Sequence, residues 1–324
     1  MNAAPRVSAA SVARPKRWWP EAAVLAAACL FGSTFKIVQR AVEDVTAFAY
    51  VTGRFTIAAL VLLPIALRQI RKQPEYPWRL LIRSSLVAGS FLAAGYLLQT
   101  EGLRFTSAST SAFITGLSTL FVPVIAGVWR RQWPAPAVGL GIVVALVGLW
   151  ILTGATLSPG KGEVLTLGCA VAYALWLLAQ QPHVRALGAI PLAAGQMIVV
   201  AVGTAPMAAV AGAGRITSVA IASMVFTAIA CAAIAVSLQL WAQRYLGSSR
   251  TALWLLTEPV FAGIVSWVTG EPMGAASMGG AAMILGGVAV SELGANDAEV
   301  DEHGDASWVG SDSWGSGVKE DSPE

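Results

Sequence analysis

Apolar segments of roughly twenty residues recur along this chain of 324 residues, separated by short polar links. Each segment is long enough to cross about 30 Å of hydrocarbon as an α-helix. Charged residues make up only 12% of the chain, whereas a soluble domain carries about 25%. The strict alternation of an outer-membrane barrel strand is absent. The sequence therefore predicts an all-α integral membrane protein built as a helical bundle.

We expect ten transmembrane helices. The predicted spans are residues 21–39, 47–67, 84–103, 109–129, 135–153, 163–181, 190–210, 218–241, 251–269 and 274–292. The fourth begins in a stretch rich in Ser and Thr, whose hydroxyls can bond back to helix carbonyls and therefore do not exclude a span. The short links at 104–106 and 244–247 predict tight hairpins between spans three and four and between spans eight and nine.

The chain partly matches itself when it is shifted by 140 residues. Residues that recur include Leu98, Gln99, Arg104 and Ser109, which correspond to Leu238, Gln239, Arg244 and Ser249. Because each copy holds an odd number of spans, the second copy must enter the bilayer from the opposite side. Such inverted repeats are typical of alternating-access transporters. The predicted divisions are a cytoplasmic segment (1–20), two five-helix repeats (21–153 and 163–292) and a tail (293–324).

Basic residues are distributed unevenly between the two sides of the predicted bundle. The side that holds the N-terminus carries most of them, and the other side carries only Arg40, Arg104, Lys161 and Arg215. The positive-inside rule then places both termini in the cytoplasm. The basic residues therefore report topology and do not indicate a nucleic-acid partner. The tail is acidic and rich in Gly and Ser, so we expect it to be disordered.

Several short motifs resemble, in order and spacing, those of the EamA-type transporters of the drug/metabolite transporter superfamily. The first is Phe31-Gly32-Ser33-Thr34-Phe35 at the end of span one. The others are Gly53-Arg54-Phe55, Gly102-Leu103-Arg104-Phe105, Phe121-Val122-Pro123, Thr257-Glu258-Pro259 and Gly270-Glu271-Pro272. The resemblance covers roughly residues 21 to 292.

The resemblance implies a ten-helix bundle with a central cavity that both halves form. Members of this family mostly export amino acids, other small metabolites or toxic compounds through a bacterial inner membrane, usually driven by a gradient. It therefore implies a multi-pass efflux transporter that works by alternating access. This chain departs from the family at Lys36, at Gln39-Arg40 and at Arg130-Arg131, where the second half has Gly270-Glu271. These departures leave the substrate unassigned.

Three charged residues within spans are candidates for a substrate cavity, because a charge there costs roughly 2.5–3.5 kcal/mol on insertion scales. Glu258 precedes Pro259, and this pair suits cation or proton handling at a discontinuous helix. A structural partnership with a basic residue is the alternative. Arg54 could hold a substrate carboxylate or could fix helix packing. Lys36 lies close to the end of span one, where it can extend outward to the interface.

Uncharged residues complete the candidate cavity. Gln99 and Gln239 are equivalent in the two repeats, and they either face one cavity or bond between helices. Tyr173, Trp176 and Trp254 either line the cavity or pack between helices. The glycines of spans five and ten predict close helix contact, either within the scaffold or at the face of a homodimer.

Motifs for enzyme chemistry are missing. The chain has no Walker-type nucleotide motif, and its two histidines and three cysteines lack metal-ligand spacing. We therefore expect no catalytic residue, metal or cofactor. The expected partners are a small-molecule substrate, the lipid bilayer, a proton as coupling ion and a second copy of the chain in a homodimer. The alternative hypothesis is a non-transporting scaffold or sensor that acts through the acidic tail.

Overall fold

The computed structural model describes residues 18–130, 135–154, 160–268 and 274–302. Within this part of the chain the secondary structure is helical, apart from an isolated bridge between Val45 and Gly214. Most of the predicted N-terminal segment and of the tail, including the stretch on which the scaffold hypothesis depends, lies outside the described residues.

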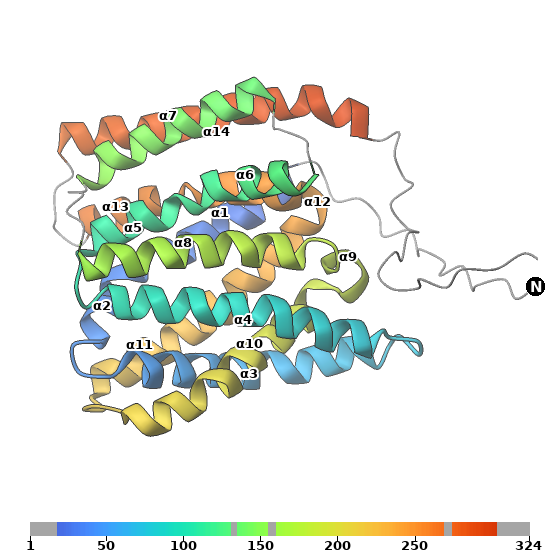
Figure 1. The fold of residues 1–324 in the computed structure, drawn as a ribbon, viewed down its shortest axis with the longest axis vertical. Coiled ribbons are helices and arrows are strands. Elements are labelled where there is room, and N and C mark those ends of the chain that lie inside the picture. The colour runs from blue at the N-terminus through green and yellow to red at the C-terminus, as the bar shows by residue number, and fades with distance from the viewer. Residues whose placement is uncertain (1–17, 131–134, 155–159, 269–273, 303–324) are drawn as a thin grey trace, which may run out of the picture.

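The first half of the chain contains α1 (Trp19–Gly32), α2 (Phe35–Ala41), α3 (Ala47–Ile70), α4 (Trp78–Gly102), α5 (Ala108–Gly116), α6 (Ser118–Arg130) and α7 (Pro136–Thr153). The second half contains α8 (Lys161–Gln180), α9 (Val184–Leu187), α10 (Ala189–Ala211), α11 (Ser218–Thr227), the π-helix η1 (Ala228–Ala235), α12 (Val236–Leu255), α13 (Glu258–Val268) and α14 (Ala275–Glu302). The long helices lie side by side in layers, with α7 and α14 along one edge and α3, α10 and α11 along the opposite edge (Figure 1).

Nine helical stretches in the described residues are long and apolar enough to cross a membrane, which confirms an all-α, multi-pass membrane protein. The sequence predicts ten. The difference arises within α12, where two helices meet at a kink at Gly247 without an intervening loop, so that predicted span eight and the start of span nine form one apolar stretch, Ser218–Leu255. Gly247 has φ 76° and ψ 174°, so the chain bends there at the one residue type that adopts this conformation without strain.

The predicted ninth span is itself interrupted. Residues 256 and 257 separate the end of α12 from α13, which begins at Glu258. Pro259 thereby falls in the first turn of a helix, where its missing N–H costs no hydrogen bond. Two other spans are interrupted as well, at Ser33-Thr34 between α1 and α2 and at Leu117 between α5 and α6.

The principal helix contacts join the two halves of the chain. Helix α3 packs on α10, α4 on α8, α1 on α12, and α7 on α14. In the last pair, an added Cβ on Gly148 would lie 2.6 Å from the carbonyl oxygen of Gly280, and Gly141 approaches Gly287 similarly. Glycines of predicted spans five and ten therefore meet each other within one chain. Gly139, Gly279 and Gly286 have open space where their Cβ would be.

Candidate functional site

A cavity lies inside the bundle between the two halves of the chain. It offers about 90 Å³ to the centres of water-sized molecules, and one water needs roughly 10–15 Å³ by this measure. The cavity can therefore hold several waters or a small solute. Its wall comes from α1 to α6 in the first half and from α8, α12 and α13 in the second. The polar side chains of the wall include Arg54, Gln99, Thr115, Ser118, Thr119, Tyr173, Gln239 and Glu258.

All three interrupted helices break at this cavity. The lining includes Phe31 and Thr34 from the first break, Gly116 and Ser118 from the second, and residues 255, 256, 258 and 259 from the third. Helix ends carry backbone groups without intrahelical partners. The N-termini of α6 and α13 also present the positive ends of their helix dipoles to the cavity. The breaks therefore add polar backbone groups to the polar side chains of the cavity wall.

Glu258 lies at the third of these breaks, as the first residue of α13, with its side chain half-buried. The main chain around it is held by α1, because Gly32 approaches the carbonyl oxygen of Glu258 so closely that a Cβ would clash. An added Cβ would also lie 3.0 Å from the backbone nitrogen of Ala262. No hydrogen bond or ion pair joins the Glu258 carboxylate to another residue that the structure describes. The carboxylate can therefore bind a solute or a proton.

Arg54 reaches the cavity from α3 and is only 3% exposed. Its guanidinium lies 4.6 Å from the ring centroid of Tyr96 and 5.7 Å from that of Phe55, and it donates a hydrogen bond to the Tyr96 hydroxyl at 3.4 Å. The Nε atom has no partner in the described part of the chain, and no ion pair joins Arg54 to Glu258. Aromatic rings stabilise a cation without neutralising it. The arginine therefore keeps a charge that can attract an anion.

Gln99 and Gln239, which are equivalent in the two repeats, both line the cavity but differ in their hydrogen bonding. The Gln99 amide donates to the Thr115 hydroxyl at 3.2 Å and accepts from the Tyr173 hydroxyl at 3.2 Å. Gln239 is fully buried, yet neither its amide nitrogen nor its amide oxygen has a hydrogen-bond partner among the described residues. A buried unpaired amide costs free energy. Gln239 therefore favours a ligand, or water, in the cavity beside it.

A chain of buried glutamines behind the cavity wall was missed in the sequence. The indole of Trp176 donates to Gln196 (2.7 Å), Gln196 donates to Gln180 (3.1 Å), Gln180 donates to Gln243 (2.8 Å), and Gln243 donates to the carbonyl of Leu177 (2.7 Å). These bonds tie α8, α10 and α12 together and hold the Trp176 ring against the cavity. The signal was available, because each of the three glutamines lies in or beside a predicted apolar span.

Two of the predicted candidates do not line the cavity. Lys36 is exposed on α2. Trp254 points instead toward α14, where its indole N–H donates to Glu292 at 2.9 Å. The structure therefore brings together Glu258, Arg54, Gln99, Gln239, Trp176 and Tyr173 and leaves Lys36 and Trp254 outside.

Comparison with known proteins gives a consistent result. The sequence model of the EamA-like transporter family matches residues 18–154 and again residues 160–293. An uncharacterized transporter of Archaeoglobus fulgidus is 30% identical over 253 residues, which are 78% of each chain. A WAT1-related protein of Arabidopsis thaliana is 28% identical over 200 residues, covering 51% of this chain and 56% of that protein. A protein of known crystal structure shares the fold with a TM-score of 0.67 at 20% identity, covering 85% of this chain and 97% of the other.

Proposed function

We propose that this chain, which belongs to the EamA-like transporter family, exports a small zwitterionic metabolite, an amino acid or a related compound. The observation that carries this proposal is the pair of opposite charges in one cavity, Arg54 and Glu258, neither of which neutralises the other. A guanidinium offers a fork of donors for a substrate carboxylate, and a carboxylate accepts from an ammonium group. A transporter family also agrees with the lack of enzyme motifs in the sequence.

The rest of the wall supports the same class of substrate. Gln239 carries a buried amide that a polar solute could satisfy. Tyr96, Tyr173 and Trp176 form a continuous aromatic surface, with ring centroids 5.5 Å and 6.0 Å apart along the series. Polar groups in such a site fix the orientation of a solute, and the aromatic surface contacts its apolar part. An amino acid with an apolar side chain matches both parts of the wall.

We propose further that two inverted five-helix repeats, residues 21–153 and 163–292, rock against each other around this cavity. The helix contacts support this arrangement. A shift of 140 residues relates α4 to the start of α12 and α1 to α8, so the α4–α8 contact has its counterpart in the α12–α1 contact. The same shift relates α3 to α10 and α7 to α14, so each of these contacts joins two equivalent helices. The breaks at Leu117 and Thr257 correspond in the same way. This is the pattern expected when one repeat is related to the other by a pseudo-two-fold axis in the membrane plane.

The repeats predict opposite sides of the membrane for two exposed positions. In a background without the native cysteines, Glu75→Cys should react with a membrane-impermeant maleimide only from the cytoplasm. Lys161→Cys should react only from the outside. Both residues are exposed, in the α3–α4 link and at the start of α8 respectively. Labelling of both positions from the same face would contradict the inverted repeat.

Transport itself is tested with the purified protein in liposomes. In counterflow, vesicles loaded with an unlabelled apolar amino acid should accumulate the radiolabelled amino acid, and an inward-directed proton gradient should alter the rate. The corresponding amine without a carboxylate should compete poorly, because it cannot engage Arg54. Protein-dependent counterflow that favours neither zwitterions nor carboxylates would refute the proposed substrate class. We also propose that the protein resides in a bacterial inner membrane and forms a homodimer.

A further inference from the structure

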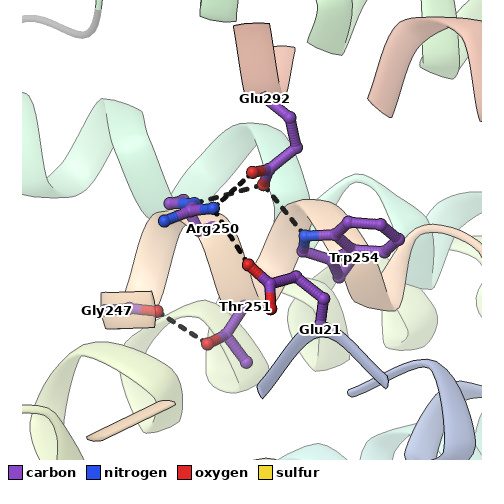
Figure 2. Close-up of polar contacts among 6 residues, drawn as sticks. All are labelled: Glu21, Gly247, Arg250, Thr251, Trp254 and Glu292. Carbon is purple, nitrogen blue, oxygen red and sulfur yellow. Dashed lines mark hydrogen bonds and ion pairs between the residues drawn. The ribbon is translucent and has the colours of Figure 1, made fainter. Parts of the chain in front are cut away.

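Three charged side chains from three helices meet in one cluster (Figure 2). Arg250 of α12 lies between Glu21 in the first turn of α1 and Glu292 of α14. Its guanidinium donates to Glu21 Oε1 at 3.3 Å, to Glu292 Oε1 at 3.2 Å, and closely to Glu292 Oε2. The side chains are only 16–17% exposed. We call these three residues the triad.

The triad joins the two halves of the chain unequally. Glu21 belongs to the first half, whereas Arg250 and Glu292 both belong to the second. Within the second half, Glu292 also accepts from the indole of Trp254, so its carboxylate is held by more bonds than that of Glu21. The second oxygen of Glu21 is buried and has no partner in the described part of the chain. The contact between Arg250 and Glu21, which joins the two halves, is therefore weaker than the contact between Arg250 and Glu292.

The triad does not line the cavity but lies beyond one end of it, with Arg250 five residues before Leu255 of the cavity wall. Glu21 precedes Phe31, the first residue of α1 that lines the cavity, by ten residues, or about 15 Å of helix. From Phe31 the cavity lining continues away from Glu21, as far as Val38 near the end of α2 and Leu103 just after α4. The triad thus closes the end of the bundle at which α1 begins, and the cavity extends toward the opposite end.

We propose that the triad is a latch between the two repeats, which holds the cytoplasmic end shut and must release Glu21 when that end opens. This inference rests on the proposed rocking of the repeats. Removing one partner of a buried ion pair is costly, because it leaves a charge without a counter-ion. Here Arg250 keeps Glu292 as its counter-ion when the repeats part, and Glu21 enters water. Because only the weaker Arg250–Glu21 contact has to break, the cytoplasmic end can open repeatedly at a low cost in free energy.

The latch is tested by access to the cavity from the cytoplasmic side. Ser118→Cys, in a background without native cysteines, places a thiol in the cavity wall, and inverted vesicles expose the cytoplasmic face to an impermeant maleimide. A minor conformation is typically populated at about 0.1–10%. Glu21→Gln and Arg250→Gln should therefore raise the labelling rate by about tenfold. Arg104→Gln is the matched control, because it breaks an exposed Arg–Glu pair within one half and should leave the rate unchanged.

Comparison of the two carboxylates separates a latch from a merely structural cluster. Glu292 accepts more hydrogen bonds, so a structural role predicts that Glu292→Gln lowers thermal stability and increases labelling more than Glu21→Gln. A latch predicts the reverse order for labelling, because only Glu21 links the repeats. Labelling of Glu21→Gln at the control rate, or below that of Glu292→Gln, would overturn the proposal. Because labelling needs no substrate, failure of the counterflow experiment would not affect this result.

Discussion

Glu258→Gln should reduce amino-acid flux by about 10–100-fold and make the residual flux independent of pH. Glutamine has nearly the same shape, so α13 should still begin beside Gly32 and the protein should remain folded. What is lost is a carboxylate without a protein partner, which is the group proposed to bind the substrate ammonium or a proton. A hydrogen bond to a charged group contributes about 1.5–3 kcal/mol, and this range corresponds to the expected loss of rate.

The measurement is counterflow and gradient-driven flux in liposomes over a range of pH. Glu101→Gln provides the control, since it removes a carboxylate that lies outside the cavity in an exposed pair with Arg104. We expect that control to retain the wild-type rate and pH profile. If Glu258→Gln also retained both, its carboxylate would have no part in substrate or proton binding, and a structural role at the helix break would remain.

Arg54→Gln should reduce flux by about 100-fold, and Arg54→Lys by about tenfold. Glutamine removes the charge that attracts a carboxylate. Lysine keeps the charge but loses the planar fork and the stacking on Tyr96, which make arginine suited to this position. The loss should be specific to carboxylates, so residual transport of an amine analogue should change little.

Thermal unfolding distinguishes this effect from damage to the fold. A buried cation without an ion pair carries a desolvation penalty, so its replacement by a neutral side chain of similar length should not lower the unfolding temperature. We expect Arg54→Gln to be at least as stable as the wild type while transporting poorly. A large fall in stability with unaltered flux per folded molecule would assign Arg54 to helix packing instead.

Residues with the same predicted role occupy different environments in the structure. Trp176 and Trp254 are both aromatics of the second half, yet Trp176 faces the cavity and Trp254 bonds to Glu292. Lys36 lies next to the break at Ser33-Thr34 but is exposed, whereas Arg54 is buried. The rotation of each helix about its axis determines these differences. That rotation results from packing against partners distant in the chain, which no local pattern reveals.

The sequence by itself determined that this is a helical membrane protein of a transporter family. The length of an apolar run must match the thickness of the bilayer, and backbone groups in hydrocarbon must bond within their own helix. The Glu258-Pro259 pair also predicted a discontinuous helix, and α13 does begin at Glu258. Only the tertiary structure decided the breaks at Ser33-Thr34 and Leu117, that Gln180, Gln196 and Gln243 bond in series, and that Glu21 meets Arg250. These features depend on which helices become neighbours, and close packing of the whole bundle selects those neighbours.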